Sequence, residues 1–195
     1  LLLVTVVFLS AFLLFVSEPL IGRLLLPFLG GAVHIWLICL MFFQAMLLLG
    51  YLYAHLFTRK FGQWHLLVLL LPLISLPFRV GTEPSFQDPI LSLIIVLLTR
   101  FALPFAILST TAVVVQSWLS QSSLGKVSEP YPLYAASNAG SLLGLVSYAF
   151  LIEPMMGLKI QSVAWAVGYG VLIILMSTIW YLLKPLQAVL PQAHG

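Results

Sequence analysis

Three charged residues stand where an apolar helix would carry them into lipid: Arg100, Glu18 and Glu153. Arg100 falls about eleven positions into the apolar run of residues 90–119, roughly 16 Å along a helix and so near the middle of a bilayer. An arginine at that depth costs about 2.5–3.5 kcal/mol, so we expect it to face the interior and pair with a carboxylate. Glu18 and Glu153 are the acidic residues beside predicted spans on the same side. A structural ion pair and a binding site for a charged solute both fit this pattern.

The two glutamates belong to a repeated pattern, F-x-x-E-P-x-x-G, at residues 15–22 and 150–157. Proline lacks a backbone donor and disfavours a helical residue before it, so each copy is expected to end a span. The first copy then predicts a broken segment over residues 20–27, with Arg23 near the interface and able to reach a carboxylate or a lipid phosphate. We expect a carboxylate of Glu18 or Glu153 within about 4 Å of an arginine nitrogen. A repeated helix stop without a binding role is the alternative.

Small residues recur every four positions in the run 132–152, at Ala136, Gly140 and Gly144, with Asn138 beside them. Such a stripe allows two helices to approach closely in lipid, and an amide can hydrogen-bond across the interface. We therefore predict a helix-packing face. A groove that admits a lipid or cofactor tail is the alternative.

Other chemistries find little support in the sequence. The chain has a single cysteine, Cys39, and no phosphate loop, dinucleotide fingerprint, nucleophile elbow or zinc motif, so we predict no catalytic residue and no metal site. No cofactor is predicted, although a helical histidine leaves tetrapyrrole binding open, as the stripe leaves lipid binding open. Eight basic residues are too few for the basic surface that nucleic acid requires.

The elements that must position these residues are membrane-spanning helices. Of 195 residues, 62% are hydrophobic and 7% are charged, which departs strongly from soluble domains. Runs long enough to cross about 30 Å of hydrocarbon predict an all-α integral membrane protein with one transmembrane domain, residues 1–195, and the lipid bilayer as its surroundings. The predicted spans are residues 1–20, 33–57, 65–78, 90–119, 132–152 and 158–183. The fourth is expected to bend at Pro104, with Ser109, Thr110 and Thr111 as hydroxyl partners for the freed carbonyls.

The basic residues of the loops give the orientation. Arg59, Lys60, Lys126 and Lys184 share a face with both termini, against Arg79, Lys159 and Arg23 on the other face. This bias favours both termini in the cytoplasm.

Longer strings of the sequence resemble the membrane part of bacterial spermidine-synthase-like proteins. The strings are residues 18–31, Trp36, residues 42–55, residues 103–111, Gln116, Trp118, residues 131–148, residues 153–158 and Gln161. The resemblance implies a major-facilitator-like half bundle in a bacterial inner membrane, fused in that family to a polyamine-synthase-like domain. No glycine-rich nucleotide loop or acidic amine-binding residues follow Lys184, so an aminopropyl transfer activity does not carry over to this chain.

Three functions stay open from the sequence. The first is a non-catalytic membrane subunit or scaffold that associates with other membrane subunits. The second is a six-helix transporter or binding module with Arg100, Glu18 and Glu153 around a polar site. The third is the membrane half of a polyamine synthase whose catalytic domain lies elsewhere.

Overall fold

The structure is a computed structural model that describes residues 1–29, 33–61, 64–79, 88–120 and 131–188. Within these ranges the regular elements are all helical, which confirms the predicted all-α class. The longer helices are α1 (Leu2–Leu29), α2 (Val33–Phe61), α5 (Ala102–Ser120), α6 (Tyr131–Ser147) and α8 (Leu158–Ala188). The shorter ones are α3 (His65–Val68), α4 (Pro89–Val96) and α7 (Glu153–Met155), with a 3₁₀ turn, η1 (Leu71–Ile74), and two π-helical segments, η2 (Leu97–Phe101) and η4 (Tyr148–Ile152).

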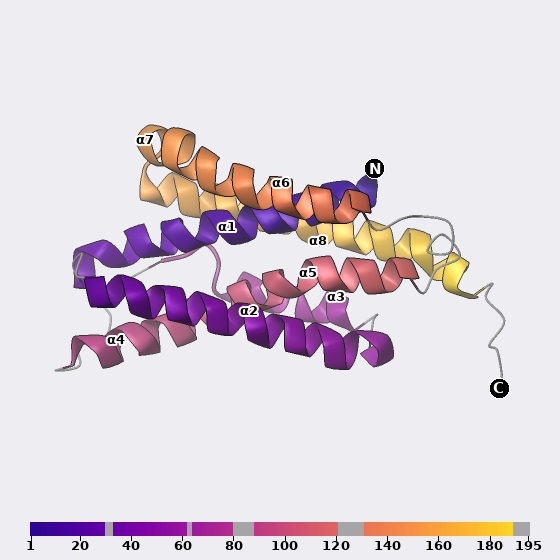
Figure 1. The fold of residues 1–195 in the computed structure, drawn as a ribbon, viewed down its shortest axis with the longest axis horizontal. Helices are drawn as coiled ribbons and strands as arrows, with labels where there is room; N and C mark the ends of the chain where they lie inside the picture. The colour runs from indigo at the N-terminus through magenta and orange to yellow at the C-terminus, as the bar shows by residue number, and fades with distance from the viewer. Residues whose placement is uncertain (30–32, 62–63, 80–87, 121–130, 189–195) are drawn as a thin grey trace.

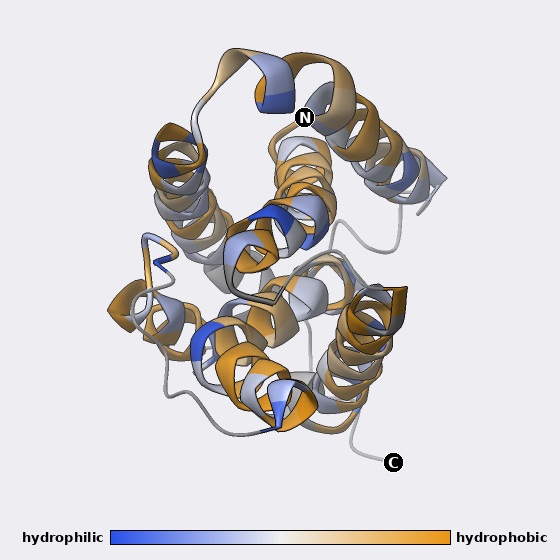
Figure 2. Ribbon diagram, turned by 90° about the vertical axis from the view of Figure 1, so that its left-hand side faces the viewer, coloured by the Kyte–Doolittle hydropathy of each residue, from blue (hydrophilic) through white to orange (hydrophobic). Residues whose placement is uncertain are grey.

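Five helical stretches are long and apolar enough to cross a membrane. They are Leu2–Pro27, Ile35–Leu56, Pro89–Ser120, Tyr131–Met155 and Leu158–Leu183. Figure 2 views the bundle from its end and shows hydrophobic residues on outward as well as inward sides of the helices. Length and composition thus fit an integral membrane protein, because a helix that is apolar on all sides is suited to lipid.

The third predicted span, residues 65–78, is not a continuous helix. The chain forms α3, then η1, and leaves helical conformation after Ile74, reaching Arg79 without a further helix. Pro72 and Pro77 account for the interruption, because neither can donate a backbone hydrogen bond. The third predicted crossing is therefore interrupted, and residues 65–74 form a short apolar helical stretch and not a helix long enough to span a membrane.

Helix α1 lies at the centre of the bundle. It packs against α6, α8 and α5, while α2 packs mainly against α5 (Figure 1). The beginning of α1 and the end of α8 lie at the same end of the bundle, and α7 lies at the opposite end (Figure 1). A helix enclosed in this way gains packing contacts along its whole length.

The first Glu-Pro motif does not end its helix. Helix α1 continues through Pro19 and Pro27 to Leu29, so the predicted broken segment over residues 20–27 is wrong. Val16, Leu20 and Ile21 are buried at 6% exposure or less, and this packing holds the helix together past the proline. In membrane helices, neighbouring helices and local adjustments re-satisfy backbone groups that proline frees.

The second motif ends its helix as predicted. A π-helical segment and the short α7 carry the helix to Met155, and Met156 is extended. The π-helical segment contains residue 150, whose carbonyl would have bonded the missing N–H of Pro154. The wider turn, with Glu153 N–H donating to the Tyr148 carbonyl, accommodates that loss.

The fourth predicted span, residues 90–119, uses the same device. Its π-helical segment η2 contains Arg100, four residues before Pro104. Ser109 and Thr110 donate to the Ala106 and Ile107 carbonyls at 2.7 and 2.6 Å. These hydroxyl bonds lie nearly two turns beyond the carbonyl of residue 100, which Pro104 leaves without its usual donor, so the π turn, and not the hydroxyl groups, relieves the proline.

Candidate functional site

An ion pair joins the end of α1 to α7. Arg23 Nε lies 3.2 Å from Glu153 Oε1, with side chains 45% and 36% exposed. The expected carboxylate–arginine contact is therefore present, and its members are Glu153 and Arg23. The Tyr148 hydroxyl is buried nearby, interacts electrostatically with both charges, and has no hydrogen-bond partner in the structure. This cluster brings the residues of the two Glu-Pro motifs together.

The structure places Glu18 within a continuous helix and Arg100 at the surface of the bundle. Glu18 is half-buried inside the unbroken α1. Arg100 is exposed on the bundle, so its predicted burial is wrong. The inward face of this helix is taken by Leu97, Phe101 and Phe105, each at 1% exposure or less, and Arg100 falls outside that face. Of the residues predicted for the polar site, Glu153 forms an ion pair, and its partner is Arg23.

The small-residue stripe of α6 lies against α1. A Cβ atom on Gly140 would meet the Phe8 backbone carbonyl, and one on Gly144 would lie 2.9 Å from the Phe12 carbonyl. Ala136, one turn earlier, is 7% exposed. Asn138 is exposed instead, on the outward side of α6, so its amide does not take part in this interface.

A polar face of α8 was missed by the sequence analysis. Tyr169 donates to the Leu69 carbonyl at 2.9 Å, and Ser162 donates to the Phe78 carbonyl at 2.7 Å. Both acceptors belong to the interrupted third crossing. Residues 162, 165 and 169 share one helix face, and this spacing of polar tips on an apolar helix was the available signal.

Two further residues of that face serve α1 and α7. Trp165 is 3% exposed and donates to the Leu13 carbonyl at 2.8 Å. Gln161 is 4% exposed and donates to the Met156 carbonyl at 2.6 Å. Gln161 therefore satisfies a carbonyl at the end of α7, whereas Trp165 ties α8 to the continuous helix α1.

A second buried polar group lies between α3 and α5. His65 is 2% exposed, and its Nε2 lies 3.4 Å from Thr110 Oγ1. Because the Thr110 hydroxyl donates to the Ile107 carbonyl, the Nε2–H must donate in this contact and Nδ1 becomes an acceptor. Nδ1 has no hydrogen-bond partner in the structure. A cavity of about 180 Å³ adjoins this pair, lined by Thr110, Tyr53 and Val68 among others.

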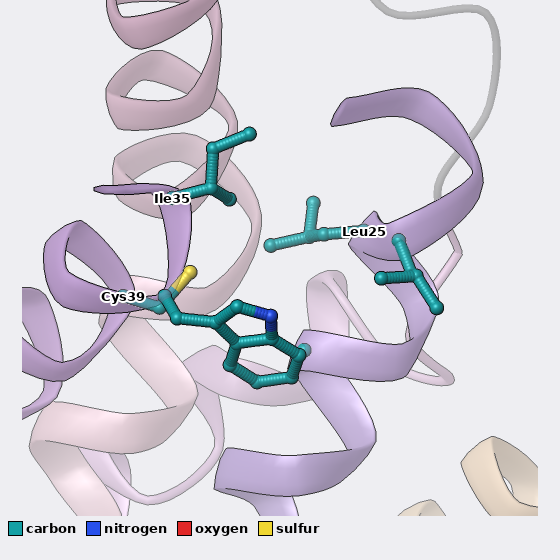
Figure 3. A pocket seen from close by; sticks show the side chains of 6 residues that line it. Leu25, Ile35 and Cys39 are labelled. Atoms are coloured by element: carbon teal, nitrogen blue, oxygen red, sulfur yellow. The ribbon is translucent and has the colours of Figure 1, made fainter. Parts of the chain in front are cut away.

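A smaller pocket lies where α1 meets α2. Trp36 covers Gly22, and a Cβ atom on Gly22 would lie 2.6 Å from the indole ring. The pocket beside it has a volume of about 10 Å³ and is lined by Leu25, Ile35 and Cys39 as well (Figure 3). This volume is below that of one water molecule, so the feature is a packing gap.

Within the described ranges, no group of three or more histidine, cysteine or acidic side chains is arranged to hold a metal ion. Comparison with known proteins found no matching family model, no matching curated protein and no matching solved structure.

Proposed function

We propose that this chain is a non-catalytic membrane module that associates with a partner membrane subunit. The observation that carries the proposal is the outward placement of two amides, Gln44 on α2 and Asn138 on α6, within candidate spans. Their neighbours Met41, Leu48 and Leu142 are exposed apolar side chains at 63% or more. An amide in hydrocarbon favours a hydrogen bond to another helix, so a partner helix with a polar side chain suits each face.

The resemblance to the membrane part of spermidine-synthase-like proteins supports the same proposal. In that family the membrane part is fused to a polyamine-synthase-like domain, so a membrane module that itself carries no catalytic residues is the expected arrangement. A bacterial inner membrane, cytoplasmic termini and a major-facilitator-like half bundle belong to this proposal. A polyamine synthase whose catalytic part lies elsewhere is a narrower form of it, and the full coding sequence tests that form.

The test is the mass of the complex after extraction from native membranes in mild detergent. We expect a defined complex heavier than the 21.5 kDa chain. The variant Gln44→Leu with Asn138→Leu should weaken association roughly threefold for each hydrogen bond lost, because a hydrogen bond between membrane helices contributes about 0.6 kcal/mol on average. The matched control is Leu48→Ile with Leu142→Ile, which keeps the outward surface apolar and should leave the complex intact. A wild-type chain that runs alone contradicts the proposal.

A solute-binding or transport module is the second candidate, and the interrupted third crossing favours it. Transporters place such broken segments beside their binding sites. The measurement is binding or uptake of charged solutes by wild type and Arg100→Ala. Loss of uptake in Arg100→Ala at an unchanged unfolding temperature supports this candidate. A lower unfolding temperature with unchanged solute binding and uptake assigns Arg100 a structural role.

A further inference from the structure

Residues of both Glu-Pro motifs line a cavity between α1, α7 and α8. Its volume is about 100 Å³, and it is partly open to the outside of the bundle. Val16 lines it from the first motif, Ile152 and Met156 from the second, and Gln161, Ala164 and Trp165 from α8. All of these side chains except Gln161 and the indole N–H of Trp165 are apolar. The cavity is therefore an apolar space with one amide at its wall.

The orientation of that amide is fixed by the end of the neighbouring helix. Helix α7 stops at Met155, and its last carbonyls need donors. Gln161 Nε2 donates to the Met156 carbonyl at 2.6 Å and to the Ile152 carbonyl at 3.5 Å. A flipped amide would set its oxygen against these two carbonyls, so the assignment is required by the hydrogen bonds.

The oxygen atom of the Gln161 amide is left without a hydrogen-bond donor. Gln161 Oε1 is buried and has no hydrogen-bond partner in the structure. A buried acceptor needs a donor, and the cavity that Gln161 lines is the space from which one can reach it. An ammonium, phosphate or carboxylate group would bury its charge among apolar side chains at high cost. A neutral hydroxyl group fits.

The depth of the cavity indicates where the hydroxyl comes from. Gln161 lies three residues past Leu158, the first residue of α8, or about 4.5 Å along the helix. Trp165 lies about 6 Å deeper, level with Leu13, to whose carbonyl it donates. The acceptor therefore marks the shallow end near the membrane interface, and apolar side chains form the deep end. A lipid with a hydroxyl group at the membrane interface and an acyl chain directed inward has its polar and apolar ends in the same order as this cavity.

We propose that this cavity binds a bilayer lipid with a free hydroxyl group, of the diacylglycerol class, which donates a hydrogen bond to Gln161 Oε1. At about 100 Å³ the cavity is smaller than the roughly 150 Å³ that holds a benzene molecule, so it takes only the hydroxyl end and the first few carbon atoms. The rest of the acyl chains lies along the outward apolar surface. This site does not depend on association with a partner subunit.

The experiment uses the full chain in nanodiscs of phosphatidylcholine that contain a diacylglycerol with a photoactivatable group close to the glycerol end of one acyl chain. Crosslinks are mapped by mass spectrometry and are expected on the peptides that line the cavity. Unlabelled diacylglycerol should compete, and triacylglycerol, which lacks the hydroxyl group, should not. Equal competition by triacylglycerol, or no crosslink at the cavity because water alone fills it, overturns the proposal. This comparison uses the wild-type chain and needs no folded variant.

A variant pair tests the place of binding. Ala164 lines the cavity and is itself exposed, so Ala164→Leu obstructs the cavity opening and should reduce crosslinking at least tenfold. Ala149→Leu makes the same change at an exposed residue outside the cavity and should leave crosslinking unchanged. Thermal unfolding of both variants reports their fold. A folded Ala164→Leu variant that crosslinks as well as wild type contradicts the assignment.

Discussion

The Nε atom of Arg23 lies 3.2 Å from Oε1 of Glu153, so the residue that follows the first Glu-Pro motif pairs with the glutamate of the second. The contact ties α1, at the centre of the bundle, to α7 at one end of it (Figure 1). Both side chains remain partly exposed, and the pair sits next to the buried Tyr148 hydroxyl. The two motif copies thus meet in space although more than a hundred residues separate them.

Removing one charge of this pair should have a small effect on stability. We expect Glu153→Gln to lower the free energy of unfolding by about 0.2–1 kcal/mol, as for other partly exposed pairs, and less at high salt. The measurement is thermal unfolding in detergent at two salt concentrations. Exchanging the charges, with Arg23→Glu and Glu153→Arg together, should restore most of the loss. Absence of any coupling between the two positions would show that the contact contributes nothing.

Adding one methyl group at Gly140 should have a larger effect. The new Cβ would meet the Phe8 backbone carbonyl, which cannot move without shifting α1. We expect Gly140→Ala to cost about 1–3 kcal/mol through overpacking. Gly170→Ala is the matched control, because no atom lies within 4 Å of its added Cβ and alanine favours the helix. Equal unfolding temperatures for the two variants would argue against close packing of α1 and α6.

The same change at Gly22 should be mild. Its added Cβ would contact the end of the Trp36 ring, which is a side chain and can rotate away. Gly22→Ala is expected to shift the fluorescence of Trp36 while the unfolding temperature changes less than in Gly140→Ala. Subtracting the spectrum of Trp36→Phe isolates that signal. A loss of stability as large as that of Gly140→Ala would mean that the ring is held rigidly.

Removing the Tyr169 hydroxyl tests the support of the interrupted third crossing. Pro72 has no N–H to offer the Leu69 carbonyl, and the Tyr169 hydroxyl donates to it at 2.9 Å. Tyr169→Phe should therefore cost about 1–2 kcal/mol, the upper range for a buried hydrogen bond in a membrane protein. Tyr181→Phe on the same helix, 76% exposed, is the control and should be neutral. Faster amide exchange at residues 69–74 would accompany the loss, and unchanged exchange would contradict it.

The sequence predicted the helices better than the polar contacts. Long apolar runs must form helices in lipid, because every backbone group needs an internal partner, and five of the six predicted spans are helical throughout. The third was misjudged because hydropathy does not register that Pro72 and Pro77 each lack a donor. The spacing of Ser162 and Tyr169 marked a polar face of α8, but the partners of that face could not be predicted, because they are backbone carbonyls.

The Glu-Pro motif separates what the sequence determined from what the tertiary structure decided. In both copies the sequence alone fixed a missing N–H at the proline and a glutamate before it. In the first copy the helix continues, because α1 is enclosed by neighbours and Trp36 packs on Gly22. In the second it ends, because nothing lies within 4 Å of the position of a Cβ on Gly157 and Gln161 satisfies the open carbonyls. Local chemistry removed one hydrogen bond in each copy, and packing contacts from distant parts of the chain decided whether the helix survived its loss.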